Sequence, residues 1–224
     1  MNSDPADASL DRHRRVKENH RRAIADAAVA LAVEFGPGGF TSEQLAAKAD
    51  VARRTVFNHY SSIGAAIYAG MGRILEGAIE SVITEFDSAL LHSQTGTDGV
   101  DLTTAFNDLC QALLRGDLVS PMSKIVSTIP TREPNSPDTD LWVGGTLRSL
   151  IPRLTTVTET RVPGSGVASR TLLVHSVLAA LTVTVEQWYL ETGGIDNDES
   201  RAVWTTTFAS HLDRLRIGFG SPAP

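Results

Sequence analysis

Four side chains in residues 52–60 could read DNA bases if they share one side of a helix. At about 100° per residue, one side of such a helix carries Arg53, Arg54, Phe57 and Asn58. A guanidinium group matches the O6 and N7 acceptors of guanine, an amide matches adenine, and an aromatic ring can pack on the thymine methyl group. The set therefore fits recognition of base edges in the major groove.

The opposite side of the same helix is suited to a small protein core, because Ala52, Val56 and Tyr60 fall together there. A second short helix should precede it. Thr41 and Gln44 have the spacing of a capping box, in which a hydroxyl and an amide satisfy free N–H groups at a helix start. An apolar stripe follows at helical spacing: Leu45, Ala46 and Ala49.

The residues alone leave two interpretations open. A short helix with these outward groups, joined to another by a tight turn, could be the recognition helix of a helix-turn-helix. It could equally be the solvated, charged face of an ordinary helical hairpin, since such hairpins are common. In the second case the chain would be a helical adapter that binds another protein and selects no DNA sequence.

The surrounding segments carry a family resemblance. They are AVEFGPGGFT, SEQLAAKADV and RRTVFNHYSS, the last with a Thr-x-Phe-x-His-Tyr run, followed by an apolar helix. Residues 16–68 resemble the N-terminal domain of the TetR family of transcriptional regulators. The resemblance implies a homodimer that represses by binding a palindromic operator in double-stranded DNA and is released by a small-molecule effector. The residues alone would equally allow an activator.

Contacts to the phosphate backbone are expected around the base-reading set. The resemblance and the helix ends indicate Ser42, Thr55 and His59, with Thr41 beside them. Residues 12–22 hold six basic residues and one acid, and Arg14, Arg15 and Lys17 are the candidates there. A solvated helix face is the alternative interpretation of this basic segment.

Three positions depart from the family pattern. Asp50 occupies the turn where glycine is usual, although aspartate tolerates the left-handed conformation better than most residues. Ala52 stands where a serine or threonine commonly caps the recognition helix, so that cap should be missing. Ile63 replaces a lysine that usually binds a phosphate.

Composition and charge favour a specific DNA reader over a protein that coats nucleic acid. The chain has 224 residues, 42% hydrophobic, with a formal net charge of −6. A local basic segment on an acidic body fits specific binding. The polar start holds no secretory signal, and the apolar run at 171–185 is too short for a membrane span of roughly 20 residues. A cytoplasmic protein that binds no membrane is expected.

We predict an all-α fold with an N-terminal three-helix helix-turn-helix domain and a helical ligand-binding and dimerisation domain. The domain boundaries are 1–11 (disordered), 12–62 (DNA-binding), 63–217 (sensing and dimerising) and 218–224 (tail). Besides the two short helices within residues 41–60, helices are predicted at 17–35, 63–91, 102–115, 121–129, 141–160 (broken at Pro152), 170–192 and 197–217. The β-branched stretch at 181–185 is the least helical in composition.

The helix at 170–192 is apolar nearly all round, which predicts a partner beyond the core of its own chain. Together with the helix at 197–217 it could form a four-helix dimer interface with a second copy. Candidates to line a largely apolar effector pocket are Phe86, Phe106, Cys110, Met122, Trp142, His175 and Trp188, although each could be simple core.

Catalysis is not expected. The chain has no G-x-S-x-G elbow, and its glycine run at residues 36–39 meets neither Gly-rich phosphate-binding consensus. His13 and His20 are seven residues apart with no carboxylate pair, which disfavours a metal site. We therefore expect neither a cofactor nor a metal. The single cysteine, Cys110, is interpreted as a small buried hydrophobe.

Overall fold

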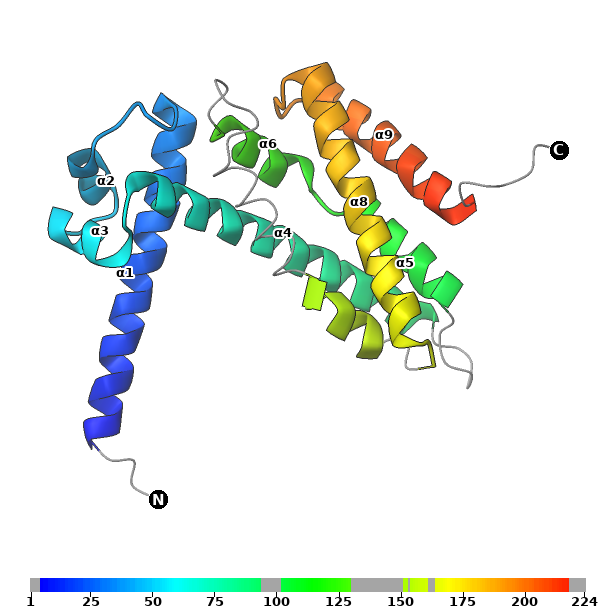
Figure 1. Ribbon diagram of the computed structural model, residues 1–224, viewed down its shortest axis with the longest axis horizontal. Helices are drawn as coiled ribbons and strands as arrows, with labels where there is room; N and C mark the ends of the chain where they lie inside the picture. Colours follow the sequence, from blue (N-terminus) through cyan, green and yellow to red (C-terminus); the bar gives the residue numbers. More distant parts are fainter. Residues whose placement is uncertain (1–4, 94–101, 130–150, 153, 161–163, 218–224) are drawn as a thin grey trace. The chain divides into compact units, whose positions relative to one another are not determined.

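The computed structural model describes residues 5–93, 102–129, 151–152, 154–160 and 164–217 (Figure 1). Within these ranges every regular element is a helix and no strand occurs. The predicted all-α fold class is therefore confirmed. The first half of the predicted helix at 141–160 and the tail at 218–224 lie outside the described residues.

Helix α1 spans Pro5–Phe35, so the predicted start at Lys17 is wrong. Proline is well suited to the first turn of a helix, and neither glycine nor proline interrupts residues 6–35. Residues 5–11, for which disorder was predicted, thus belong to this helix. Its end is at the predicted place, because Gly36 follows with a φ of 80° that few other residues adopt.

The two short helices are α2 (Ser42–Lys48) and α3 (Arg53–His59), and both pack on α1. The core of this part is apolar and closely packed. Side chains with 0% exposure include Ile24, Ala28, Leu45, Val56, Ala66 and Met71. The helices at the chain's N-terminal end therefore share one small core.

Helix α4 spans Ile63–Ser93 and runs through the boundary between two compact units. The first unit ends within α4 at Ile74 and also includes the end of α6 from Ser127, while the second begins at Leu75. The early turns of α4 bury Ala66, Ile67 and Met71, and its later turns bury Ala78, Val82 and Phe86. One helix thus contributes to two cores.

Within the first unit, α4 approaches α1 very closely at Gly70. A Cβ atom at this position would lie 2.5 Å from Ala25 O and 2.5 Å from Val29 Cγ2. One turn later, Arg73 Nε donates to Asp26 Oδ1 at 3.0 Å and forms an ion pair with the same carboxylate. The early part of α4 therefore packs on α1 within the first unit.

The second unit contains α5 (Leu102–Arg115), α6 (Val119–Ser127), α8 (Val167–Thr192) and α9 (Asp198–Ile217). The bounds of α5 are those predicted, and α9 differs by one residue. Helix α6 begins two residues early and also ends two residues early, while α8 begins at Val167 instead of 170. Residues 151–152 and 154–160 are helical, which agrees with the second half of the helix predicted at 141–160.

Helices α8 and α9 pack along one another through aromatic side chains. The Trp188 and Trp204 rings meet edge to face with centroids 5.3 Å apart, and Trp204 meets Phe208 at 5.9 Å. The indole Nε1–H of Trp188 donates to Ser200 Oγ at 2.7 Å, so this fully buried ring has no unsatisfied donor. Burial of these aromatic rings and the hydrogen bond of the indole N–H therefore stabilise the packing of α8 on α9.

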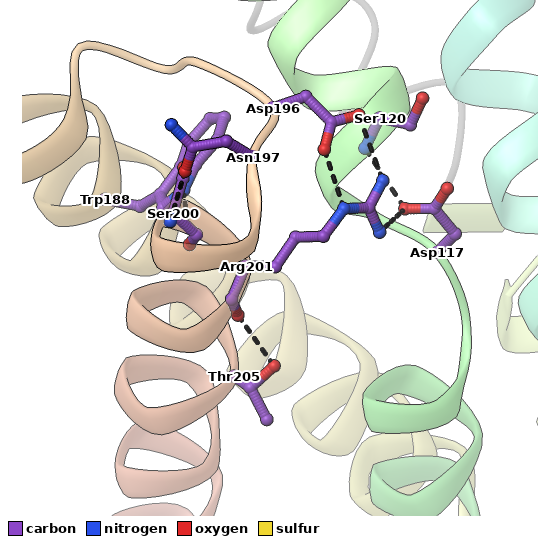
Figure 2. Close-up of polar contacts among 8 residues, drawn as sticks. All are labelled: Asp117, Ser120, Trp188, Asp196, Asn197, Ser200, Arg201 and Thr205. Atoms are coloured by element: carbon purple, nitrogen blue, oxygen red, sulfur yellow. Dashed lines mark hydrogen bonds and ion pairs between the residues drawn. The ribbon is translucent and has the colours of Figure 1, made fainter.

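Arg201 connects the start of α9 to the turn between α5 and α6 (Figure 2). Its Nε donates to Asp196 Oδ1 at 2.7 Å, and its Nη1 donates to Asp117 Oδ1 at 3.2 Å. Asp117 Oδ1 also accepts the backbone N–H of Ser120 in the first turn of α6. These groups are partly exposed, so they fix the position of the two turns more than they add stability.

One side of α8 is exposed and apolar. Leu172 is 69% exposed, Val183 is 49% exposed and Leu190 is 77% exposed. Their spacings of 11 and 7 residues place them within about 20° of one another around the helix. By length and mean hydropathy (1.4) this helix could also cross a membrane. The other side of α8, however, carries Trp188 and lies in the protein core. A core helix of a globular domain passes the same test of length and hydropathy.

Candidate nucleic-acid interface

The capping box at the start of α2 is formed as predicted. Thr41 Oγ1 accepts the Gln44 N–H at 3.3 Å, and Gln44 Oε1 accepts the Thr41 N–H at 2.8 Å. Leu45, Ala46 and Ala49 are buried beneath the helix. The reciprocal cap fixes the first turn of α2, which carries the buried Ser42 and the exposed Glu43 beside α3.

The turn between α2 and α3 has the features expected from its unusual residues. Asp50 adopts a φ of 53°, the left-handed conformation for which glycine is more common. Ala52 is the N-cap of α3, and no side chain caps that end of the helix. Ala52 is also exposed, so its predicted place in the core is wrong: a cap residue lies outside the helical periodicity.

Helix α3 buries the side that the helical wheel assigned to the core. Val56 is 0% exposed and Tyr60 is 7% exposed, and the Tyr60 hydroxyl donates to Arg21 O at 3.0 Å. The opposite side carries the base-reading set, all exposed: Arg53, Arg54, Phe57 and Asn58. The structure therefore brings these four residues together on one surface.

Arg53 is held by three groups at this surface. Its Nε donates to Ser42 Oγ at 3.0 Å and lies 3.0 Å from Glu43 Oε1. Its guanidinium carbon lies 5.8 Å from the centroid of the Phe57 ring. The Ser42 hydroxyl also donates to Glu43 Oε2 at 3.2 Å. Ser42, a candidate for phosphate binding, is thus bonded to a candidate for base reading.

Glu43 is the residue that the sequence did not reveal as part of this site. An acidic residue in the first turn of a helix is favoured by the helix dipole, so the position of Glu43 in the sequence indicated only a stabilised helix start and no role beside Arg53. Its pKa lies below the usual value, chiefly because of its own backbone N–H, then the Thr41 hydroxyl, with Arg53 a smaller cause. Glu43 is therefore a carboxylate at neutral pH.

His59 ends α3 beside the basic segment of α1. Its ring meets the His20 ring edge to face, with centroids 6.3 Å apart. Burial lowers the pKa of His59, and the charges of His20, Lys17 and Arg21 lower it further, while Glu18 opposes them. The last turn of α3 thus lies beside the basic segment of α1.

The remaining phosphate candidates lie on the same unit. Thr55 is half-buried, and Thr41, Arg15 and Lys17 are exposed. Arg14 makes only a long ion pair with Asp11, with Nη1 and Oδ1 3.9 Å apart, and both side chains are exposed. Such a pair is weak enough that Arg14 can turn toward a phosphate.

The effector candidates differ in burial. Phe86 and Trp188 are fully buried, Cys110 and Met122 are buried, Phe106 is half-buried, and Trp142 lies outside the described residues. His175 is exposed in the single chain, so it does not belong to the chain's own core, while its alternative place in an interface between two copies stays a prediction; its Nδ1 lies 2.7 Å from Thr171 O. Cys110 is buried as predicted, and burial raises its pKa to about 12.

Metal-binding chemistry has no support in the described part of the chain, where no three His, Cys, Asp or Glu residues gather in a way that could hold an ion.

Comparison with known proteins identifies the N-terminal domain. Residues 24–65 match the sequence profile of the family described as bacterial regulatory proteins, tetR family. No curated protein matches the chain. A protein from Shewanella sp. PV-4 assigned to the tetR family of transcription regulators has 17% identity and a TM-score of 0.46, with 87% of this chain and 96% of that chain covered.

A transcriptional regulator from Rhodococcus sp. Rha1 has 17% identity and a TM-score of 0.44, covering 86% of this chain and 96% of that chain. The match to the family profile covers residues 24–65, which contain α2, α3 and the turn between them.

Proposed function

We propose that this chain is a transcriptional regulator like those of the tetR family, whose profile residues 24–65 match, and that it represses transcription by binding a palindromic operator as a homodimer. A small, largely apolar effector would release it. The observation that carries DNA binding is the two-sided α3, with Val56 and Tyr60 buried below and four base-reading side chains exposed above.

The exposed side of α3 enters the major groove in this proposal. Arg53 and Arg54 would read guanine, Asn58 would read adenine, and Phe57 would pack on a thymine methyl group. Phosphates would be bound around them, and the candidates are Thr41, Ser42, Thr55, His59, Arg14, Arg15 and Lys17. Base contacts specify the site and phosphate contacts position the helix.

Dimerisation is supported by the exposed apolar side of α8. Leu172, Val183 and Leu190 lie on one side of the helix, and water contact there is unfavourable at about 25 cal/mol per Å². A second copy would cover this side, with α8 and α9 of each chain forming a four-helix interface. Two recognition helices would then meet half-sites one DNA turn apart, roughly 34–36 Å, which requires a two-fold operator.

Effector binding would use residues 63–217, and the DNA-binding domain would be residues 12–62. The burial of Phe86, Cys110 and Met122 in the second unit supports an apolar ligand over a charged one. Helix α4 belongs to both units, so a ligand that prefers a different tilt of α4 would change the spacing of the recognition helices. A ligand that bound both tilts of α4 with equal affinity would not release the protein from DNA.

The test of this function is selection from random DNA by the full-length protein, followed by gel shift on the selected site. Convergence on a palindrome, with a dimer by light scattering, is the expected result. A protein adapter would select no sequence. Deletion of the gene should raise expression of the operator-bearing target in a cytoplasmic repressor, and lower expression would mean activation instead.

A further inference from the structure

An acidic residue lies where the proposed interface would meet DNA. Glu43 and Arg53 are both largely exposed at the side chain, at 61% and 62%, and yet they are paired at 3.0 Å. A carboxylate at such a surface repels phosphate and should weaken binding to any DNA. Its presence beside Arg53 therefore needs a reason other than affinity.

The geometry of the Arg53 guanidinium supplies that reason. The contacts to Ser42 Oγ and Glu43 Oε1 are made through Nε, and Phe57 lies against the guanidinium carbon. A guanidinium can meet guanine through its Nε edge or through its two terminal Nη groups. With Nε already bonded, the Nη edge is the one that remains for the O6 and N7 atoms.

We propose that Glu43 is a positioning residue that determines specificity, because it holds Arg53 by Nε and aims the Nη edge at a guanine. This inference rests on the proposed function. Ser42 is the second support of Arg53, so its hydroxyl serves this purpose in addition to any phosphate contact. Glu43 and Arg53 act as one unit across the gap between α2 and α3.

Two physical effects then favour discrimination over affinity. An arginine that is already ordered loses less rotamer freedom on binding its base than a free one. The Glu43 carboxylate, charged at neutral pH, also weakens binding to non-specific DNA, where no guanine compensates. The ratio of specific to non-specific affinity is raised by both.

The experiment uses the full-length protein and the site that the wild type selects from random DNA. Kd is measured at one salt concentration on that site, on the site with each guanine replaced in turn, and on unrelated duplex DNA. Arg53→Ala identifies the base that Arg53 reads, as the position where replacement no longer matters. The variants are Glu43→Ala, Glu43→Gln, Arg53→Ala and the double variant of Glu43→Ala with Arg53→Ala.

Glu43→Ala should tighten binding to unrelated DNA and reduce discrimination at the Arg53 position roughly threefold to tenfold, the size of a typical pairwise coupling. In the Arg53→Ala background the same change should leave discrimination unaffected. Glu43→Gln keeps the length and shape of the side chain but removes the charge that pairs with Arg53 Nε, so it should tighten non-specific binding and lose part of the discrimination. Glu34→Ala removes an exposed acid on α1 and is the control for net charge.

The outcomes separate the inference from the proposed function. A wild type that selects no sequence overturns the proposed function itself. If a site is selected but Glu43→Ala tightens all DNA equally, Glu43 only repels phosphate and the positioning role is wrong. The role is also wrong if Arg53→Ala changes no base preference, or if Glu43→Ala acts equally in both backgrounds.

Discussion

At the scale of single residues, His59 links the proposed DNA binding to pH. In the free protein its pKa is lowered by burial and by the charges of His20, Lys17 and Arg21, so it is neutral at neutral pH. A bound phosphate favours the imidazolium form and would raise that pKa. Between the pKa of His59 in the free protein and its higher pKa in the DNA complex, the complex binds more protons than the free protein. The affinity for DNA must therefore increase as the pH falls through that range.

We therefore predict that the operator Kd decreases when pH is lowered from about 8 toward about 6, by at most about tenfold per pH unit for one proton. His59→Gln should remove most of this dependence while leaving Lys17 and Arg21 in place. Titration of binding at constant ionic strength measures both. An identical pH dependence in His59→Gln would assign the proton uptake to another group.

The helical wheel predicted the individual residues of α3 well and their mutual contacts poorly. A period of about 100° per residue is enough to separate Val56 and Tyr60 from Arg53 and Phe57. The pairing of Arg53 with Glu43 depends on how two helices meet around Asp50, and no local pattern contains that information. Glu43 consequently looked like an ordinary acid in a first helical turn.

At the scale of elements, the close approach of α1 and α4 depends on Gly70. An alanine there would place Cβ 2.5 Å from the Ala25 carbonyl oxygen, which is backbone and cannot rotate away. We predict that Gly70→Ala destabilises the protein by about 1–3 kcal/mol, the usual cost of overpacking. Thermal or urea denaturation of the full chain should show the loss.

Gly72 is the matched control, two residues along the same helix. No atom lies within 4 Å of a Cβ built there, so Gly72→Ala meets no clash. It should stabilise α4 by about 0.5–1 kcal/mol, because glycine in a helix interior is less favourable than alanine. Equal effects of the two substitutions would mean that α1 and α4 are not in contact at Gly70.

Cys110 reports on the packing of α5. Burial raises its pKa to about 12, and the charge of Arg216 on α9 opposes this only in part. Because the thiolate is the reactive form, we predict that a thiol reagent at pH about 8 does not modify the native protein at an appreciable rate. Labelling should begin with denaturation; rapid labelling of the folded protein would contradict the packing of α5.

Helix bounds were predictable where breakers are present and less so where they are absent. Helix α1 stops at Gly36 as predicted, but nothing in residues 5–16 marks its true beginning except a proline that also suits loops. The β-branched stretch of α8 is helical although its residues favour strands, because burial in the packed core outweighs local propensity. Thr182 and Thr184 satisfy their hydroxyls within this helix by donating to carbonyls four residues earlier, at 2.9 and 2.7 Å.

At the scale of the whole molecule, the exposed side of α8 predicts the oligomeric state. Leu172→Glu with Leu190→Glu would bring two carboxylates into the proposed interface and leave the chain's own core unchanged. We predict that this double variant is a monomer, with a mass near 24.0 kDa by light scattering, and that it binds the operator at least tenfold more weakly.

Val167→Glu is the control for that variant. Val167 is also apolar and 65% exposed, but it lies about 140° around α8 from Leu172. It should leave both the mass and the operator affinity of the wild type unchanged. A double variant that remains a dimer would show that copies of this chain meet through another surface.

The fold class was predictable from the sequence because helical periodicity recurs along the chain. The cores of the two units were only partly predictable, since an apolar stripe does not say which neighbour it meets. His175 is an example: it lies in an apolar helix and points to solvent, because α9 covers only one side of α8.

The passage of α4 through both units has a consequence for building chimeric regulators. The boundary between Ile74 and Leu75 is a peptide bond within a continuous helix, so no flexible linker is available for exchanging domains. Each residue inserted there would rotate one unit against the other by about 100° and move it by about 1.5 Å. Exchange of the DNA-binding unit should therefore succeed only when the junction preserves helical phase, and grafts that differ by one or two residues in length should lose operator binding while each unit still folds.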